Sequence, residues 1–422
     1  MLAMMQQFQG LIGLAAVLLL AWSLSEDRAN RPGWRWLGGA LLLQLAIAVI
    51  VVRVPAVWAA VSVANQGVAA IEKATLVGSS YMFGFLGGAP LPFALAQGAS
   101  PPLIIAFQIL PLIIVFSALS ALLWHWGILK ALVRGLSWAL RRTLGVSGVV
   151  GLGGGGTLFL GVVESPLALR AWFATMSRSD LFAIMAMIMA TISGAILVLY
   201  ASTLGNVIPN AAGHLIVASL ISLPAALMVA RLMVPGQPQS TEPAEPDLAY
   251  DGAMDAVVRG AMEGVQLMLA VIGIIITIFA LVALADQILA LAPHVDGAAL
   301  TLKRMFGWIF SPFMWAIGVP WDQAPAAGAL MGTKAILNEY VAYLDLAALP
   351  AGTLDPRSAL IVTYALAGFA NLASIGLLVS TIASLSPERR AEAAGLGVKS
   401  WIAGNLATLM TGAMIGLVTP LV

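Results

Sequence analysis

Eight apolar runs, each long enough to cross a bilayer, dominate this sequence. About 20 apolar residues suffice to cross roughly 30 Å of hydrocarbon as a helix. Of the 422 residues, 61% are hydrophobic and only 9% are charged, whereas soluble domains average about 25% charged residues. The sequence therefore predicts an all-α integral membrane protein with eight transmembrane helices, at 8–24, 37–54, 102–126, 180–203, 213–234, 265–289, 358–384 and 400–421.

The remaining composition excludes several classes of protein. A formal net charge of +1 creates no field that would attract nucleic acid. The absence of cysteine rules out disulfides, thiolate metal sites and cysteine nucleophiles. The three histidines are far apart, and no metal-ligand spacing is present. The run at 8–24 has no Lys or Arg before it, so we expect a retained span rather than a signal peptide.

The distribution of Lys and Arg predicts the orientation in the membrane. Cytoplasmic loops carry an excess of these residues. If the amino terminus lies outside, most of the basic residues, among them Arg28, Arg178, Arg389 and Lys399, become cytoplasmic. We therefore expect a multi-pass protein of the plasma (inner) membrane with both termini on the periplasmic or extracellular side.

Four segments between the runs are more polar. Residues 128–145 place basic side chains on one side and Leu, Val and Trp on the other, a pattern typical of an interfacial helix. Residues 56–74 and 252–264 are weaker candidates of the same kind. The linker 235–251, rich in Pro and acidic residues, is expected to be flexible.

Two apolar stretches, 147–173 and 305–340, carry helix breakers near their middles, at Gly161–Pro166 and Gly318–Pro325. Irregular backbone survives at membrane depth only when it is buried in protein or lines a cavity. These stretches therefore predict two re-entrant helical hairpins. Each is followed by a span with a small-polar break, so the order of elements predicts an inverted repeat. Polar residues cluster in these interrupted elements, which predicts elevator-type movement of the hairpins and broken spans against a scaffold.

These features divide the chain into four predicted parts. The first, 1–146, holds N-terminal scaffold spans and interfacial helices. The second, 147–234, holds the first hairpin and its following spans. The linker and an interfacial helix form 235–264, and 265–422 holds a scaffold span, the second hairpin, a broken span and the last span.

Ionisable side chains at membrane depth are costly and usually functional. Three of them, Glu164, Lys334 and Glu339, lie in the interrupted stretches. Buried amides and hydroxyls accompany them and could bind the hydroxyls and ring edges of a small polar solute. Two alternatives stay open: an ion network among the three that only fixes helix register, and ordinary hydrogen bonds between spans.

Three segments resemble the concentrative nucleoside transporter family. GTKAILNEYVAY (332–343) is similar to the family pattern Gly-x-Lys-x-x-x-Asn-Glu-Phe-Val-Ala-Tyr, with Tyr340 in place of Phe. GFANLASIGLL (368–378) and residues 386–408 resemble its following span, loop and last span. Residues 317–320 and 164–166 fit its two hairpins. The resemblance covers most of 100–420.

The resemblance implies a homotrimer that imports nucleosides by cation symport, and no enzyme. It places the substrate between the hairpin tips and the broken spans. The family carries Gln and a hydroxyl residue where this chain has two valines, which implies an altered choice of base. The implied substrate-binding residues are Glu164, Val162, Val163, Glu339, Asn338, Phe369, Asn371 and Ser374.

The resemblance also implies a coupling cation and no other cofactor. Sodium-coupled relatives carry an Asn and a Ser where this chain has Thr157 and Thr191, with backbone carbonyls from Leu160 and Ile192. Hydroxyl and carbonyl oxygens still suit a hard cation, so sodium is slightly favoured. A proton carried on a carboxylate is the alternative.

The sequence leaves three alternative functions. The first is the same scaffold carrying a modified nucleoside, or another small hydroxylated or heterocyclic solute, with proton coupling. The second is a membrane enzyme or receptor that uses Glu164 and Glu339 as paired carboxylates. The third is a purely structural oligomer, which has no need of buried charges at hairpin tips.

Overall fold

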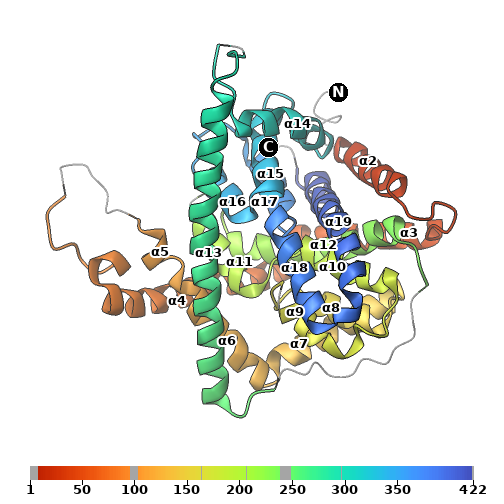
Figure 1. The fold of residues 1–422 in the computed structure, drawn as a ribbon, viewed down its shortest axis with the longest axis horizontal. Helices are drawn as coiled ribbons and strands as arrows, with labels where there is room; N and C mark the ends of the chain where they lie inside the picture. The colour runs from red at the N-terminus through yellow and green to blue at the C-terminus, as the bar shows by residue number, and fades with distance from the viewer. Residues whose placement is uncertain are drawn as a thin grey trace.

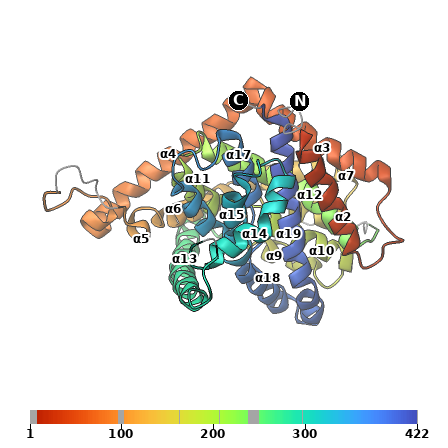
Figure 2. The ribbon, with the colours of Figure 1, turned by 90° about the horizontal axis from the view of Figure 1, so that it is seen from above.

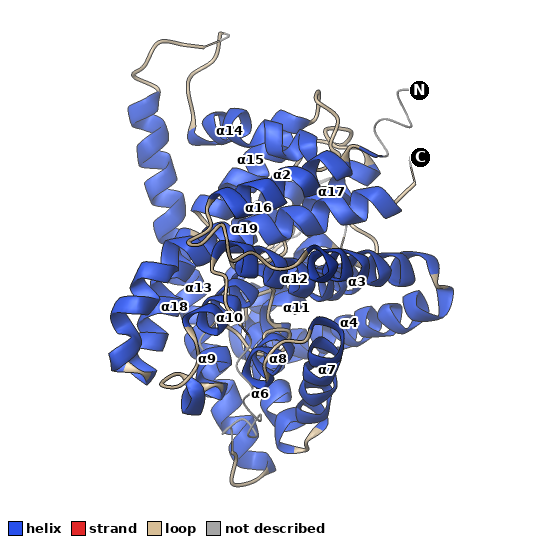
Figure 3. Ribbon diagram, turned by 90° about the vertical axis from the view of Figure 1, so that its right-hand side faces the viewer, coloured by secondary structure: helices blue, strands red, loops and turns tan. Residues whose placement is uncertain are grey.

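The structure is a computed structural model that describes residues 8–95, 103–162, 164–205, 207–237, 249–295 and 297–420. Within these residues every regular element is an α-helix or a short 3-10 helix, and one isolated β-bridge joins Val295 to Ala298. Figure 3 shows the packed helices and the loops that connect them. The prediction of an all-α chain is confirmed.

The N-terminal elements come before two series of similar order. In each series a span is followed by an amphipathic helix, two short helices, a broken span and a closing span (Figure 1). The N-terminal elements are α2 (Gly10–Ser23), α3 (Trp34–Arg53), α4 (Pro55–Phe83), η1 (Gly84–Gly87) and α5 (Ile105–Gln108). The first series is α6 (Pro111–His125), α7 (Ile128–Leu144), α8 (Gly148–Gly156), α9 (Glu164–Ala168), η2 (Arg170–Trp172), α10 (Arg178–Ala190), α11 (Gly194–Leu204) and α12 (Ala211–Met233). The second is α13 (Ala253–Leu289), α14 (Leu302–Ala316), α15 (Ala324–Ile336), α16 (Glu339–Ala347), α17 (Pro356–Leu366), α18 (Leu372–Leu385), η3 (Pro387–Arg389) and α19 (Arg390–Val418).

The two helices that open the series, α6 and α13, pack antiparallel along a glycine seam. A Cβ added at Gly260 would lie 2.7 Å from the Ser117 carbonyl, and one at Gly264 would lie 2.6 Å from the Ile114 Cα. The contacts move back along α6 as α13 advances, so the helices run in opposite directions. Small residues four apart let two helix backbones approach closely in a membrane.

The long helix α13 exposes most of its other residues. Its buried residues are Ala256, Gly260 and Gly264, four apart along the helix, and the two glycines contact α6. Figures 1 and 2 show α13 at the edge of the helical body, with α4 extending away from that body toward α5. The elements α4, α5, α6 and α13 thus form a peripheral group beside a densely buried core.

The predicted runs and the helices agree in position. Helices long and apolar enough to cross a membrane cover Trp34–Arg53, Ile105–His125, Arg178–Leu204, Ala211–Met233, Ala253–Leu289 and Pro387–Val418. The shorter apolar helices α2 and α18 fall in the runs predicted at 8–24 and 358–384. Each of the eight predicted runs therefore corresponds to a helix or a broken helix.

The structure agrees with some of the predicted surface helices and not with others. Residues 128–145 form α7, which buries Leu129, Val133 and Leu140 on one side, and 56–74 lie within the longer α4. The prediction of a separate interfacial helix at 252–264 is wrong, because these residues lie at the start of the continuous 37-residue α13. In the linker 235–251, positions 238–248 lie outside the described residues.

Two spans are interrupted at mid-length, as predicted. The first break separates α10 from α11 at 191–193, and the second separates α17 from α18 at 367–371. The breaks meet at glycines: a Cβ on Gly368 would lie 2.8 Å from the Met189 carbonyl oxygen, and one on Gly404 of α19 would lie 2.5 Å from the Met189 Cβ. The irregular backbone is therefore buried in protein, as membrane depth requires.

The second hairpin differs from its prediction. Its tip was predicted at Gly318–Pro325, where the structure instead has the turn between α14 and α15. Glu339 starts α16, after a second interruption at Leu337 and Asn338. Because α14 occupies the place of α7 in the series, the two short helices that match α8 and α9 are α15 and α16. Gly318, whose φ is +116°, favours a turn, but this turn joins α14 to α15 and precedes the tip.

An ion-pair network joins the α2–α3 loop to the starts of α10 and α19. The Glu26 carboxylate lies 2.7 Å from Arg178 and 2.6 Å from Lys399, and Arg178 also pairs with Glu392 at 3.5 Å. The hydrogen bond from Arg178 is the largest cause that lowers the pKa of Glu26 to about 2. These charged residues thus gather on one face of the molecule.

Candidate functional site

Each series places a carboxylate at the first residue of its second short helix. Glu164 begins α9 and Glu339 begins α16. The residue before Glu339, Asn338, caps α16 by accepting a hydrogen bond from the Val341 amide at 2.8 Å. The free N–H groups of a helix start favour a negative charge there. The predicted residues Asn338 and Glu339 therefore shape one helix end together.

The Glu339 carboxylate is buried and held by two side chains. Its Oε1 accepts a hydrogen bond from the Tyr200 hydroxyl at 2.5 Å, and its Oε2 accepts one from the Asn371 amide at 2.8 Å. Asn371 also caps α18, because its Oδ1 accepts from the Ser374 N–H at 2.8 Å. The Asn371 N–H donates to the Phe369 carbonyl at 2.8 Å, which closes the turn of the break. One asparagine therefore fixes the break and orients the carboxylate.

Sequence reasoning missed Tyr200. It lies on α11, and its ring contacts Tyr340 and Tyr343 with centroid distances of 5.7 and 5.0 Å. The Tyr343 hydroxyl in turn donates to the Thr363 carbonyl at 3.0 Å. A tyrosine on a broken span at membrane depth needs a partner for its hydroxyl, and that need was the signal available.

The first tip is less polar. Glu164 folds back over Gly161, where a Cβ would collide with its carboxylate, and α9 packs against α18. Val162 is 7% exposed. Val163 lies outside the described residues. The tip therefore carries one carboxylate at the start of a helix that packs against α18, with one buried apolar side chain shortly before it.

The four residues predicted for the cation lie at two adjacent helix C-termini. Thr157 ends α8 and donates to the Gly154 carbonyl at 2.9 Å, while Thr191 ends α10 and donates to the Met187 carbonyl at 2.9 Å. A Cβ on Gly154 would lie 2.8 Å from the Met187 sulfur, so the two ends touch. The buried hydroxyl oxygens keep lone pairs, which is the oxygen chemistry that a hard cation prefers.

The carbonyl donors in this set differ in availability. The Leu160 carbonyl already accepts the Ser165 hydroxyl at 3.2 Å. Ile192 lies in the extended break, where its N–H donates to the Ser219 hydroxyl at 3.1 Å. The hydroxyls and the Ile192 peptide therefore fit a cation better than the Leu160 carbonyl does.

Lys334 does not pair with Glu339, in contrast to the ion network that the sequence left open. Its ammonium donates to Asn405 Oδ1 at 2.9 Å, to Thr408 Oγ1 at 2.8 Å and to the Ala365 carbonyl at 3.4 Å. In the described part of the chain no salt bridge joins Lys334 to Glu339, although the two charges attract each other at longer range. The lysine thus connects α15, α17 and α19 through neutral oxygens.

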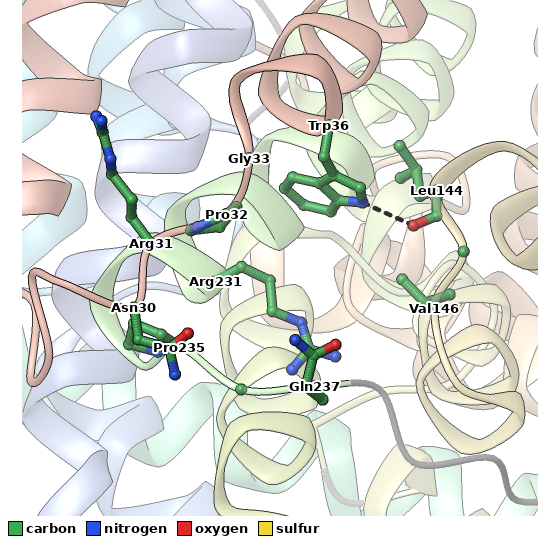
Figure 4. Close-up of a pocket in the computed structure, with 12 residues that line it drawn as sticks. Asn30, Arg31, Pro32, Gly33, Trp36, Leu144, Val146, Arg231, Pro235 and Gln237 are labelled. Atoms are coloured by element: carbon green, nitrogen blue, oxygen red, sulfur yellow. Dashed lines mark hydrogen bonds between the residues drawn. The ribbon is translucent and has the colours of Figure 1, made fainter.

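A cavity of about 340 Å³ lies apart from this cluster, between the α2–α3 loop and the ends of α7 and α12 (Figure 4). The Trp36 indole donates to the Leu144 carbonyl at 2.8 Å across one wall. Arg231 lines another wall, and its guanidinium is held by Asp180 at 2.5 Å. None of the predicted site residues that the structure describes lines this cavity, so it is a junction between helices rather than a match for the predicted site.

Three family profiles cover most of the chain. They are described as the N-terminus of a Na+ dependent nucleoside transporter, matching 12–86, a nucleoside recognition domain, matching 106–207, and the C-terminus of a Na+ dependent nucleoside transporter, matching 214–416.

Relatives and solved structures match over nearly the full length. The uncharacterized transporter YutK of Bacillus subtilis is 34% identical over 97% of this chain and 98% of its own length. The putative nucleoside permease NupX of Escherichia coli is 31% identical over 98% and 99%. CNTnw in an inward-facing substrate-bound state is 32% identical, with a TM-score of 0.86 and coverage of 97% of both chains.

The fold is thus that of a helical, multi-pass membrane transporter. The chain belongs to the family of Na+-dependent, or concentrative, nucleoside transporters, as the resemblance of 332–343 and 368–378 indicated.

Proposed function

We propose that this chain imports nucleosides across the plasma membrane by symport with a cation, with sodium favoured over a proton. The observation that carries the proposal is the buried Glu339 carboxylate, oriented by Tyr200 and Asn371 between a hairpin tip and a broken span. A charged acceptor with fixed direction suits a pair of ribose hydroxyls, and hydrogen bonds to charged groups contribute about 1.5–3 kcal/mol.

The other predicted residues take supporting roles in this proposal. Asn371 and Ser374 present the start of α18 to the ribose, and Phe369 packs near the base. Glu164 and Val162 approach from the first tip, with Asn338 holding the second tip in shape. Buried polar groups at a break are expensive in a membrane unless they serve a pathway for solute.

Sodium is favoured by the donor set at the ends of α8 and α10. Thr157 and Thr191 offer neutral hydroxyl oxygens beside two helix C-termini. Negative helix ends and oxygen ligands attract a small cation without needing a carboxylate. The cation is transported together with the nucleoside. If the cation binds first, its transport and that of the nucleoside are coupled.

The proposed transport cycle is an elevator. The peripheral group α4, α5, α6 and α13 serves as the scaffold, and the hairpins with the broken spans move as a block. The antiparallel seam of Gly260 and Gly264 supports an inverted repeat. The exposed surface of α13 would meet partner copies in a homotrimer, with both termini outside the cell. The four-part division at 146, 234 and 264 is kept, except that α13 begins at Ala253.

Uptake of radiolabelled uridine into proteoliposomes tests the proposal. We expect concentrative uptake under an imposed sodium gradient, little under a proton gradient alone, and its loss in Glu339→Gln. Uptake driven only by protons would replace the ion and keep the function.

A modified nucleoside is a second candidate, favoured by the buried apolar Val162 at the first tip. It is tested with a competition panel of base-modified nucleosides against uridine. Absence of nucleoside uptake under either gradient, together with absence of nucleoside binding, would overturn both candidates.

A further inference from the structure

The two series place different residues at one shared position. Leu337 caps the C-terminus of α15, and Thr157 caps the C-terminus of α8. Three residues before these caps lie Lys334 in α15 and Gly154 in α8. In both series this helix packs against the first half of the following broken span. A fully buried lysine therefore stands in one series where a glycine stands in the other.

The surroundings of Lys334 form a cation-binding cage. Its three ammonium hydrogens meet an amide oxygen of Asn405, a hydroxyl of Thr408 and the backbone carbonyl of Ala365. Ala365 is within the last turn of α17, where carbonyls lack helical partners. Lys334 is itself in the last turn of α15, and a positive charge is stabilised at a helix C-terminus.

At the corresponding place in the first series, the described residues provide oxygen ligands, and no Lys or Arg stands at the position of Lys334. Gly154 cannot accept a side chain without moving its neighbours, since a Cβ would lie 2.8 Å from the Met187 sulfur and 2.9 Å from Leu140 Cδ1. The hydroxyls of Thr157 and Thr191 bind the carbonyls of Gly154 and Met187. Two helix C-termini thus meet here, and Thr157 and Thr191, which end them, are neutral oxygen ligands.

We propose that the Lys334 ammonium is a built-in cation that fills the second of two repeat-related cation positions, leaving the first to a cation from solution. The proposal rests on the proposed symport at Thr157 and Thr191. It explains why one series has a lysine and the other a glycine: both positions collect helix-end carbonyls, and only one carries its own charge. It assigns one exogenous cation per nucleoside.

The simpler alternative is that Lys334 only joins α15, α17 and α19 by hydrogen bonds. Lys334→Gln tests the charge, because its amide keeps hydrogen-bond donors on this side of α15 but carries no charge. Lys334→Ala removes the charge and opens space for an ion among the oxygens of Asn405, Thr408 and Ala365. Lys303→Ala is the matched control, since Lys303 is exposed and pairs with Asp345 at 2.7 Å.

The experiment uses the full chain, purified and reconstituted, with sodium chloride against choline chloride. The two readouts are the charge moved per nucleoside, from the reversal potential, and the sodium-dependent rise in unfolding temperature. We expect Lys334→Ala to bind a second sodium, so that its charge per nucleoside doubles and its sodium-dependent stabilisation exceeds that of the unmodified protein. Lys334→Gln should lose at least tenfold in uptake, and Lys303→Ala should change neither readout.

The other outcomes separate the proposal of a built-in cation from the proposal of sodium symport. Unchanged sodium dependence in folded Lys334→Ala, with normal uptake by Lys334→Gln, would overturn the proposal and leave Lys334 as a hydrogen-bonding link. If the unmodified protein ignores sodium but Lys334→Ala gains a sodium response, the built-in cation stands and the sodium symport at Thr157 and Thr191 falls. If Lys334→Ala does not fold, the uptake by Lys334→Gln decides. Uptake equal to that of the unmodified protein refutes a role for the Lys334 charge, and a tenfold loss of uptake supports that role.

Discussion

The two tips, between α8 and α9 and between α15 and α16, occupy equal places in their series and differ in the residues beside their carboxylates. Glu339 is buried, and both of its oxygens accept hydrogen bonds from other helices. Glu164 lies over a glycine beside the buried Val162. The same element order has therefore produced a preorganised tip in the second series and a more apolar tip in the first.

This difference suggests a division of labour. A rigid, charged acceptor suits the part of a substrate that all nucleosides share, because the cost of orienting it is met during folding. A tip with few polar groups suits the part that varies, because changes there leave the fixed acceptor intact. We therefore expect the second tip to control affinity and the first tip to control choice of base.

The strongest test of this comparison is the pair Glu339→Gln and Glu164→Gln. We expect Glu339→Gln to weaken nucleoside binding by about 10–150-fold, since it loses charge-assisted hydrogen bonds, and Glu164→Gln to weaken it less. Isothermal titration with uridine in detergent measures both. A larger loss in Glu164→Gln would reverse the ranking of the tips.

The crossing that holds both breaks together is tested by Gly404→Ala. The added Cβ would lie 2.5 Å from the Met189 Cβ, and overpacking of this kind costs typically about 1–3 kcal/mol. We expect a clear fall in unfolding temperature. Gly395→Ala is the control on the same helix, because nothing lies within 4 Å of a Cβ there. Equal effects from the two substitutions would contradict the described crossing.

Tyr200→Phe tests the missed partner of Glu339. It removes one donor and leaves a buried carboxylate oxygen unpaired, which costs about 1–3 kcal/mol. We expect up to about a 100-fold weaker affinity for the nucleoside with the protein still folded. Tyr343→Phe is the comparison, because its hydroxyl donates to a carbonyl rather than to Glu339. Similar affinities in the two variants would remove Tyr200 from the site.

Val162→Gln sharpens the role of the first tip. A new amide near the base adds a hydrogen bond worth about 0.5–1.5 kcal/mol, or roughly 2–13-fold in relative affinity between bases. Competition of purine and pyrimidine nucleosides against labelled uridine measures the change. If all nucleosides shift equally, Val162 does not contact the base.

The smallest effect is expected on the face that carries the Glu26 network. The pKa of Glu26 is lowered to about 2, so its stabilising contribution is complete above the unfolded value near 4.5 and is lost as pH falls toward about 2. Glu26→Gln should therefore lower the unfolding temperature slightly at pH 7, by the equivalent of about 0.2–1 kcal/mol. The difference should shrink below pH 4.5. A difference that grows on acidification would contradict this pairing.

The sequence allowed the spans, the breaks and the carboxylates to be predicted, because burying charge and irregular backbone in lipid leaves a visible pattern. Tyr200 was missed because an aromatic residue in an apolar run resembles ordinary core, and only the need of its buried hydroxyl for a partner marked it. The predicted start of α13 was wrong because residues 252–264 are more polar than the apolar run that follows and resembled a separate interfacial helix, whereas Gly260 and Gly264 pack closely on α6. The second tip was displaced because the turn at Gly318 is stronger in sequence than the short interruption before Glu339.

The contact between Met189 and Gly404 has a consequence for how the chain is made. About 215 residues separate these positions, so at roughly 5–20 residues per second of synthesis the first break enters the membrane about 10–40 s before its partner exists. During that interval the peptide groups at 191–193 have no second break to cover them. The first series is therefore synthesised before the residues that cover its break, and its packing is completed only when α19 has been made.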